Sequence, residues 1–257
     1  MRVADSEHSA VVRRSFERQA SLFVGADSPF APRPSSTLSW IEPLAADMVV
    51  LDVACGAAHA SEPVAHAVHR LIGIDLTPAL LRIGAERLRQ AGVSNVLLQV
   101  GDAQALPFVD ESFDVVFCRS SLHHFADPAR AVEQMRGVCR CGGRVVLVDL
   151  IAPDVQTREL FDHIHRLLDP SHVRTFTEVE LTELIPGGFA ELSYANTANI
   201  RLPIDVAITE QSDGEQVRSL LRAELDGTGE VTGFEPDDID GSIVVSFTTS
   251  IIHALKL

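Results

Sequence analysis

Between residues 49 and 149 the chain alternates short apolar runs, rich in β-branched residues, with longer stretches of helical periodicity. This alternation is typical of parallel strands joined by crossover helices. The apolar runs are nearly continuous, which indicates strands that are buried on both faces of a sheet. We expect strands at residues 48–53, 71–75, 96–100, 115–118 and 144–149.

Helices are expected between these strands, at residues 61–69, 78–91 and 128–139. The second is bounded most clearly, because Thr77 suits an N-cap, Pro78 the first helical position and Gly92 a stop. The pattern predicts an α/β fold in a single domain, since 257 residues are enough for one large domain. After residue 149 we expect helices at residues 157–168, 178–184 and 215–225, and strands at residues 190–197 and 242–253.

The segment before the first strand predicts a cover for one edge of the sheet. Residues 1–25 read as an amphipathic helix, and residues 27–34 read as an irregular connector with three prolines. We expect residues 1–35 to fold over the open edge of a site, residues 36–152 to form the ligand-binding core, and residues 153–257 to supply a substrate wall and the final strands.

The charge balance argues against nucleic acid as a partner. The chain carries 21 Lys and Arg residues against 36 Asp and Glu residues, a net charge of −15 that would repel a phosphate backbone. Nothing in the sequence reads as a signal peptide or as the roughly 20 apolar residues of a membrane span. We therefore expect a cytoplasmic protein without a membrane or nucleic-acid partner, present as a monomer or a homodimer.

The four cysteines predict neither a disulfide framework nor a zinc site, because their spacing lacks paired ligand clusters. Asp162 and His163 are neighbours but lack a tight set of further ligands, so no metal site is expected. We interpret the cysteines as reduced thiols: Cys55, Cys118, Cys139 and Cys141.

Three polar points stand at the ends of three successive predicted strands. Gly56 lies in a tight turn after the first strand, where a small residue lets a nucleotide-like ligand approach the backbone. Asp75 ends the second strand and can accept hydrogen bonds from both ribose hydroxyls of an adenosine. Asp102 ends the third strand, where an adenine amine would lie, with the amide of Ala103 available to a ring nitrogen.

Each of these residues taken alone has a plainer interpretation. Gly56 suits an ordinary turn, Asp75 the N-terminus of a helix, and Asp102 a turn former. Independent turn residues have no reason to surround one crevice, however. Their coincidence on successive strand ends therefore predicts a single site for an adenosyl ligand.

These residues resemble the motifs of class I S-adenosylmethionine-dependent methyltransferases, in particular the ubiquinone/menaquinone-type and small-molecule (methyltransferase type 11-like) branch. The resemblance is strong over residues 45–155 and loose in the tail. It implies a Rossmann-like methyltransferase fold, with a seven-stranded, mostly parallel sheet, an antiparallel last strand and helices on both faces. The motif segments are residues 51–56, residues 73–75, residues 101–108 with 112–114, and residues 139–149.

The resemblance also implies a cofactor, S-adenosylmethionine, which leaves the reaction as S-adenosylhomocysteine. Residues 16–23 resemble the helix that covers this cofactor in the branch. The implied contacts are Asp52, Ala54 and Gly56 to the methionine end, Asp75 and Leu76 to the ribose, Asp102 and Ala103 to the adenine, and Cys118 at the pocket floor.

The glycine-rich turn departs from the family pattern of three glycines at alternate positions. Those positions hold Ala54, Gly56 and Ala58 in this chain. Alanine at the first position is a familiar variant, whereas the methyl group of Ala58 is expected to crowd the ligand or to restrict the turn to negative φ. Pro63 follows closely and fits only if a helix begins near Ser61.

Methyl transfer needs alignment, exclusion of water and deprotonation of a weak nucleophile. The segment after the fourth strand places His123 and His124 beside the crevice, and only one of two neighbours can point inward. In related small-molecule O-methyltransferases a histidine at the position of His123 pairs with an aspartate that ends the fifth strand, here Asp149, which implies a catalytic pair. The plainer interpretation is that both residues cap a loop or a turn.

Contacts to the methyl acceptor are assigned to His124 and to the insertion between the fifth and sixth strands. Arg174 could receive a carboxylate or an enolate through its planar fork. Placement on an ordinary surface is the alternative for these residues. The assigned residues of the insertion are His165, His172 and Arg174.

The sequence thus favours transfer of a methyl group from S-adenosylmethionine to an oxygen or carbon of a small-molecule acceptor in secondary metabolism. An alternative keeps the fold but uses the altered turn for a non-methylating step such as cyclisation. A nicotinamide oxidoreductase is disfavoured because the G-x-G-x-x-G spacing is absent. A non-enzymatic binding module is disfavoured because acidic residues at three strand ends indicate a ligand crevice.

Overall fold

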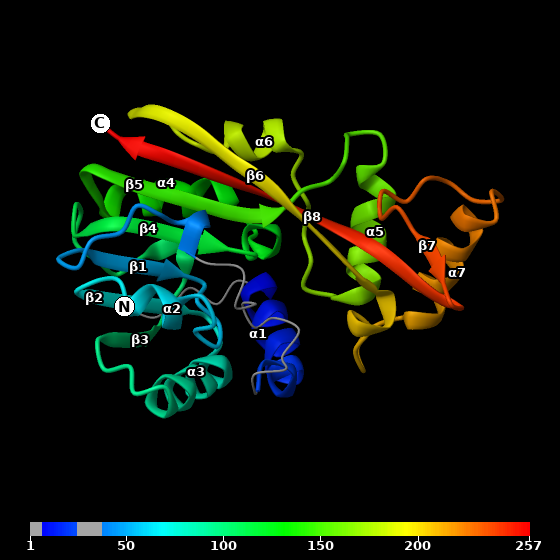
Figure 1. The fold of residues 1–257 in the computed structure, drawn as a ribbon, viewed down its shortest axis with the longest axis horizontal. Helices are drawn as coiled ribbons and strands as arrows, with labels where there is room; N and C mark the ends of the chain where they lie inside the picture. The colour runs from blue at the N-terminus through cyan, green and yellow to red at the C-terminus, as the bar shows by residue number, and fades with distance from the viewer. Residues whose placement is uncertain (1–6, 25–37) are drawn as a thin grey trace.

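One mixed β-sheet forms the centre of the computed structural model, which describes residues 7–24 and 38–257 except for the side chains of residues 190–198 (Figure 1). The strand order is β3-β2-β1-β4-β5-β8-β6, and a further strand, β7, pairs with β8. The first five strands are parallel to one another. They are β1 Val49–Val53, β2 Arg70–Asp75, β3 Val96–Val100, β4 Phe113–Arg119 and β5 Cys139–Leu150.

The last long strand, β8 (Ser242–Lys256), is inserted between β5 and β6 (Phe189–Pro203) and runs antiparallel to both. This arrangement confirms the expected Rossmann-like order with an antiparallel last strand. The described sheet has eight strands where seven were expected. The additional strand, β7 (Asp237–Ile239), is short and exposed, so its residues carry no apolar alternation that would have predicted it.

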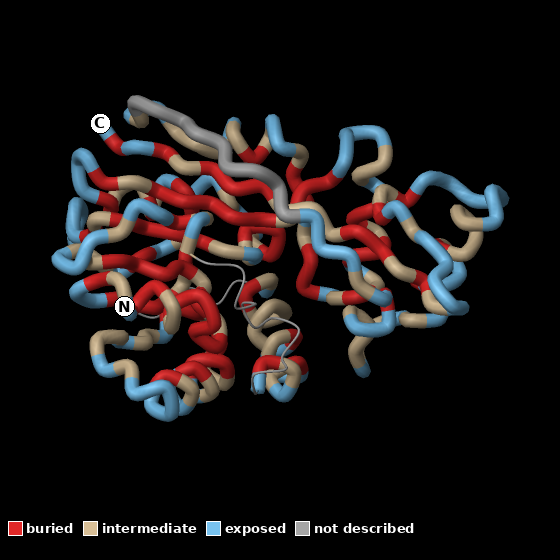
Figure 2. The backbone as a smooth tube through the Cα atoms, in the orientation of Figure 1, coloured by how far each residue is buried: buried red, intermediate tan, exposed pale blue. Residues whose placement is uncertain are grey.

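Helices cover both faces of the parallel strands, as expected. On one face, α4 (Pro128–Val138) packs its apolar side chains against inward residues such as Leu51 and Val116. On the other face, Val64 of α2 (Ser61–Ala65) packs with Val50 and Phe117. Figure 2 shows the resulting buried strands at the centre of the sheet. The sequence therefore reads as near-continuous apolar runs because both faces are covered.

A second apolar cluster lies at the far end of the β6–β8 ribbon, beyond β5 (Figure 1). It joins α5 (Arg158–Leu168) and α7 (Gly214–Leu225) to Ile243 and Val245 of β8. These partners explain why β6 and β8 are longer than the expected strands at residues 190–197 and 242–253. The short helix α6 (Glu178–Glu183) begins with a capping box formed by Thr177 and Glu180.

Several boundaries differ from those expected. The helix α2 ends at Ala65 rather than residue 69, because the chain turns before β2 begins at Arg70. The expected helix of residues 1–25 is α1 (Glu7–Gln19), continued by the 3₁₀ turn η1 (Ala20–Phe23). The connector at residues 27–34 lies outside the described residues. The helix α3 (Pro78–Gln90) does start after Thr77 and is followed by Gly92, which has a φ of +69°.

Two helical glycines provide a matched test of this packing. A Cβ atom at Gly84 of α3 would lie 3.0 Å from the carbonyl carbon of Ala57, whereas one at Gly137 of α4 would meet only Asp110 at 3.5 Å. We expect Gly84→Ala to lower the free energy of unfolding by about 1–3 kcal/mol through overpacking. Gly137→Ala should raise it by roughly 0.5–1 kcal/mol through helix propensity. Urea unfolding measures both, and equal signs would contradict the close approach of α3 to the turn after β1.

Candidate active site

The turn after β1 has a left-handed backbone at all three positions where the family pattern places glycine. The φ angles are +58° at Ala54, +53° at Gly56 and +59° at Ala58. The expectation that Ala58 restricts the turn to negative φ is therefore wrong, although two alanines in this region cost about 1–2 kcal/mol each. Ala58 is fully buried, and its Cβ lies 3.1 Å from the position that a Cβ at Gly84 would occupy. Its methyl group thus packs against α3.

Asp75 ties the ends of neighbouring strands together. Its Oδ2 accepts a hydrogen bond from the amide of Gly56 at 2.8 Å, and its Oδ1 accepts one from the amide of Thr77 at 2.7 Å. The carbonyl of Asp75 accepts from the amide of Gly101 at 3.0 Å, which places Asp102 beside it. Burial raises the pKa of Asp75, although these backbone hydrogen bonds oppose the shift. The three sequence-predicted points therefore converge at one edge of the sheet.

This edge has the donors and acceptors that a nucleoside requires. The carboxylate of Asp75 accepts hydrogen bonds from the amides of Gly56 and Thr77, and its oxygens are the kind of acceptor that ribose hydroxyls require. Asp102 caps the 3₁₀ turn η3 (Ala103–Ala105) by accepting from the amide of Gln104 at 2.8 Å. The amide of Ala103, at the start of this turn, has no partner within the turn itself. These groups fit an adenosyl ligand.

The other implied cofactor residues line the same edge or the core below it. Asp52 is buried on β1 and accepts a hydrogen bond from the Ser61 hydroxyl at 2.6 Å. Burial, opposed by this hydrogen bond, raises the pKa of Asp52 to about 7. Leu76 is half-buried after β2. Cys118 is fully buried in the apolar cluster beneath α4, and burial raises the pKa of its thiol well above the ordinary value.

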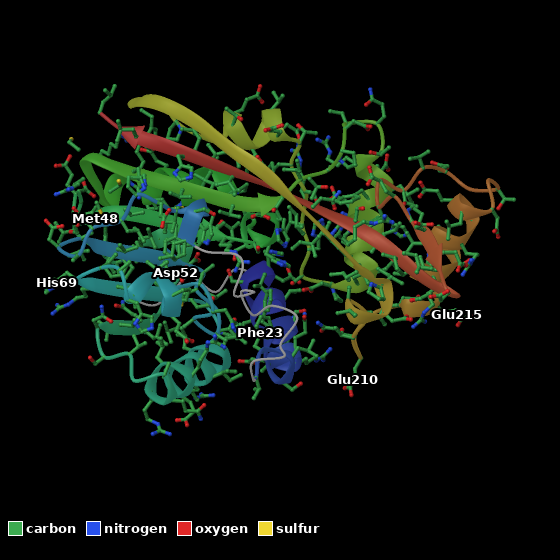
Figure 3. All side chains as sticks on the ribbon, in the orientation of Figure 1. Phe23, Met48, Asp52, His69, Glu210 and Glu215 are labelled. Atoms are coloured by element: carbon green, nitrogen blue, oxygen red, sulfur yellow. The ribbon has the colours of Figure 1, made fainter. Side chains whose placement is uncertain are left out.

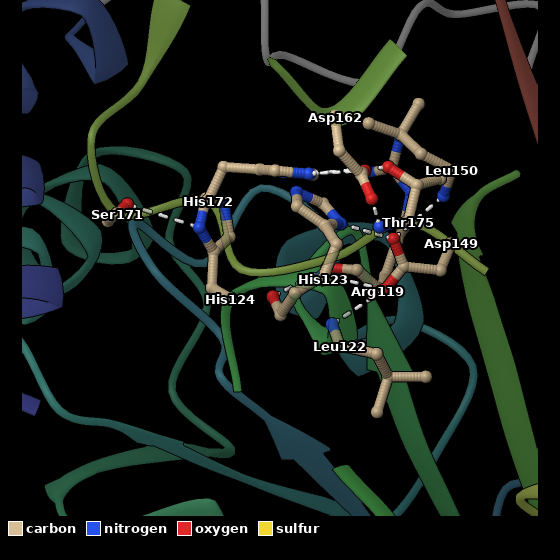
Figure 4. Close-up of polar contacts among 11 residues, drawn as sticks. Arg119, Leu122, His123, His124, Asp149, Leu150, Asp162, Ser171, His172 and Thr175 are labelled. Carbon is tan, nitrogen blue, oxygen red and sulfur yellow. Dashed lines mark hydrogen bonds and ion pairs between the residues drawn. The ribbon is translucent and has the colours of Figure 1, made fainter. Parts of the chain in front are cut away.

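Asp149, at the end of β5, is fully buried and holds the loop after β4. Its Oδ2 accepts hydrogen bonds from the amides of Ser121 at 3.1 Å and Leu122 at 2.6 Å, and its Oδ1 accepts from the amide of Leu150 at 2.7 Å. Its Oδ1 also pairs with Nδ1 of His123 in a short ion pair (Figure 4). The structure therefore brings together the two residues that the resemblance assigned to catalysis.

The electrostatics of this pair favour its charged form. Burial alone would lower the pKa of His123, but the adjacent Asp149 carboxylate outweighs it and raises that pKa above the ordinary value of 6.5. Burial likewise opposes ionisation of Asp149, yet the imidazolium and the backbone hydrogen bonds lower its pKa. Because a carboxylate oxygen only accepts, Nδ1 carries a proton and Nε2 remains for another partner.

Three further histidines surround His123, two of them from the insertion. The ring centroid of His123 lies 4.2 Å from that of His124 and 5.6 Å from that of His172, which stacks on His165 at 4.9 Å. His172 pairs through Nε2 with Asp162 at 2.8 Å (Figure 4). Burial lowers the pKa of His124 to about 3 and also lowers the pKa values of His165 and His172. The result is one imidazole with a raised pKa among three with lowered pKa values.

The backbone amide of Arg174 donates to the carbonyl of His123 at 3.3 Å, but its side chain has its partners outside this cluster. Its side chain is 46% exposed, pairs with Glu180 and lies over the ring of Phe176 at 5.5 Å.

Two acidic residues that contact the site, Asp162 and Asp169, were not assigned from the sequence. Asp162 pairs with His172, and Asp169 accepts hydrogen bonds from Ser15 and Gln19 of α1. Because these partners are separated from the acids in the sequence, residue spacing gives no signal for either acid.

The helix α1 lies between the sheet edge and the α5 and α7 cluster (Figure 1). Phe23 and Phe16 pack near Ala57 and Leu80 of the core. The hydroxyl of Ser15 and the amide of Gln19 donate to Asp169 at 2.8 and 3.0 Å. The ring of Phe16 meets His124 edge-on at 5.0 Å, and Nε2 of His8 donates to the carbonyl of His124 at 2.8 Å. This helix therefore contacts both sides of the candidate site.

Within residues 7–24 and 38–257, no three His, Cys, Asp or Glu side chains are grouped so that they could bind a metal ion. In the same described ranges, no helix has both the length and the apolar character needed to cross a membrane.

Comparison with known proteins identifies the fold and its motifs. Residues 51–147 match the family described as the methyltransferase domain. The chain is 37% identical over 156 residues to the uncharacterized methyltransferase YcgJ of Bacillus subtilis, covering 60% of this chain and 61% of that protein. It is 36% identical over 108 residues to the demethylmenaquinone methyltransferase of Thermobifida fusca, covering 42% of this chain and 46% of that protein. The matches thus span less than two thirds of either relative's length.

Solved structures extend the likeness over most of the chain. The crystal structure of YcgJ superposes with a TM-score of 0.74 at 29% identity, covering 83% of this chain and 93% of that chain. The [4+2]-cyclase SpnF superposes with a TM-score of 0.55 at 18% identity, covering 94% of this chain and 81% of that chain, which shows a shared fold alone. The sheet order and the superposition on YcgJ thus show a Rossmann-like methyltransferase fold, and residues 51–147 are similar in sequence to the methyltransferase domain family.

Proposed function

We propose that the protein transfers a methyl group from S-adenosylmethionine to an oxygen or carbon of a small-molecule acceptor in secondary metabolism, with His123 as the general base. The observation that carries this proposal is the buried His123–Asp149 pair. It stands at the ends of β4 and β5, on the same sheet edge as the nucleoside-binding groups at the ends of β1, β2 and β3. Binding groups and a base thus share one edge.

The residues of this edge divide the cofactor between them. Asp75 would hold the ribose hydroxyls, and Asp102 with the amide of Ala103 would hold the adenine. Asp52 and the turn at Gly56 would face the amino-acid end. When bound there, S-adenosylmethionine supplies an electrophilic methyl carbon on a sulfonium, with S-adenosylhomocysteine as the leaving group.

His123 would remove the proton of the acceptor as the nucleophile reacts. The Asp149 carboxylate accepts a hydrogen bond from Nδ1–H of His123 and so fixes the tautomer of the ring. The lone pair of Nε2 is then the group that accepts the proton of the acceptor. The resulting imidazolium is stabilised by the same carboxylate. A raised pKa makes His123 a stronger base than a free imidazole.

The acceptor would meet the surrounding histidines. His124, His165 and His172 are neutral at pH 7 because burial lowers the pKa of each. Neutral imidazoles offer lone pairs as well as N–H groups, so they suit an acceptor that carries hydroxyl groups. Arg174 would contact a substrate carboxylate only by leaving its ion pair with Glu180. We further propose that α1 covers the site and excludes water during the reaction.

Binding of the cofactor can be tested by thermal unfolding. We expect millimolar S-adenosylmethionine to raise the Tm of the wild type, and Asp75→Ala to abolish most of this rise, since two charge-assisted hydrogen bonds together alter affinity by roughly a hundredfold or more. Asp47→Ala, an exposed acid before β1, is the matched control and should retain the full shift. A wild-type Tm that the cofactor leaves unmoved would sink the proposed function.

Catalysis can be tested with methyl-labelled S-adenosylmethionine and a library of phenols and quinols. We expect labelled product from the wild type and a rate about 10²–10⁴-fold lower from His123→Ala, because a general base contributes this much. The affinity of His123→Ala for S-adenosylhomocysteine should change less than about threefold, since the base acts on the acceptor. Wild-type rates in His123→Ala would contradict the assigned base, and label in any product excludes a purely non-methylating role.

The charged pair also predicts a pH-dependent stability. Because the folded pKa of His123 is raised, its ion pair contributes fully below pH 6.5 and is lost as the pH rises through that folded pKa. Asp149→Asn should therefore cost roughly 3 kcal/mol near pH 6 and clearly less near pH 9. Asp162→Asn is the matched control, because burial lowers the pKa of its partner His172 and keeps that ring neutral. Urea unfolding measures both, and a pH-independent cost for Asp149→Asn would refute the charged pair.

A further inference from the structure

Three polar side chains gather on one face of the sheet where β1 and β4 end. Asp52 lies opposite Phe117 in the parallel register of β1 and β4. Because alternate residues of a strand share a face, Arg119 lies on the same face as Phe117 and Asp52. His59 precedes α2, the helix that covers this face. Figure 3 shows Asp52 toward the end of the sheet that faces Phe23, with Met48 and His69 at the opposite end.

Arg119 is a half-buried cation that pairs with none of the described side chains. Among the described residues, no hydrogen bond or ion pair involves its guanidinium group. Its charge nevertheless acts on both Asp52 and His59, which places the three groups in one neighbourhood.

His59 presents a buried acceptor that receives no donor from the part of the chain that the structure describes. Its side chain is 6% exposed, and its Nε2 lies 3.2 Å from the carbonyl of Phe23. A carbonyl only accepts, so Nε2 carries the proton and Nδ1 holds the lone pair. Nδ1 is buried and has no hydrogen-bond partner within residues 7–24 and 38–257. An unsatisfied buried acceptor is costly, and it is explained if a ligand supplies the missing donor.

These groups complement the two charges of an α-amino acid. The planar fork of a guanidinium matches a carboxylate, whereas a carboxylate and an imidazole lone pair both accept from an ammonium group. We propose that Arg119 binds the α-carboxylate of the cofactor's amino-acid end, and that His59 Nδ1 shares its α-ammonium group with Asp52. This inference rests on the proposed function, since it divides the polar end of the same adenosyl ligand.

Two ligands distinguish binding at this subsite from binding at the nucleoside groups. S-adenosylhomocysteine carries the amino-acid end, whereas 5′-methylthioadenosine keeps the nucleoside and the thioether but lacks it. We would measure the Kd of both by calorimetry for the wild type, Arg119→Gln, Arg119→Lys and His59→Phe. Arg70→Gln, an exposed arginine at the start of β2, controls for the change in net charge.

We expect Arg119→Gln to weaken the binding of S-adenosylhomocysteine at least about tenfold, because charged hydrogen bonds are lost. The Kd of methylthioadenosine should change less than about twofold. Arg119→Lys keeps the positive charge but lacks the planar guanidinium group, so its affinity for S-adenosylhomocysteine should lie between those of the wild type and Arg119→Gln. His59→Phe keeps an aromatic ring beside Phe23 and should weaken S-adenosylhomocysteine roughly threefold or more. Arg70→Gln should match the wild type for both ligands.

If the Arg119 and His59 variants lost equal affinity for both ligands, or lost none for either, the proposed subsite would be wrong. If Arg119→Gln does not fold, Arg119→Lys and His59→Phe decide the question by the same comparison. A wild type that binds methylthioadenosine as tightly as S-adenosylhomocysteine also overturns it, but leaves the nucleoside site intact. A wild type that binds neither ligand instead removes the proposed function, so the two failures are distinguishable.

Discussion

The buried carboxylate of Asp149 is the interaction on which the site depends. It lies at the end of a central strand and accepts hydrogen bonds from three backbone amides and from His123. A fully buried carboxylate is stable only when such partners replace water. It therefore fixes the loop after β4 to β5, and that loop carries His123 and His124. Since His124 is also a contact of α1, the position of the covering helix depends on the same carboxylate.

The surrounding electrostatics follow from burial. The imidazole next to Asp149 has a raised pKa, whereas burial lowers the pKa values of His124 and His165. A proton removed from an acceptor would thus be more stable on His123 than on these neighbouring rings. Ser15 and Gln19 of α1 engage Asp169 beyond α5, so the N-terminal helix links the parallel core to the C-terminal cluster across this group of histidines.

The sequence predicted the parallel core well because its strands are buried on both faces and read as unbroken apolar runs. It also predicted the convergence of Gly56, Asp75 and Asp102, since parallel strands end at one edge. It did not predict β7 or the full length of β6 and β8, because those depend on partners in α5 and α7. The pairing of His172 with Asp162, and the exposure of Arg174, likewise depend on how the insertion folds. At Ala58, packing against Gly84 overrides the local preference for negative φ.

A structure of the protein with S-adenosylhomocysteine bound measures most directly whether the nucleoside groups and the base belong to one site. We expect the ribose hydroxyls on the carboxylate of Asp75, and the sulfur at the edge of the sheet that carries His123, with Nε2 of His123 facing the position of the lost methyl group. A nucleoside bound elsewhere, or a sulfur separated from His123 by packed side chains, would contradict this arrangement.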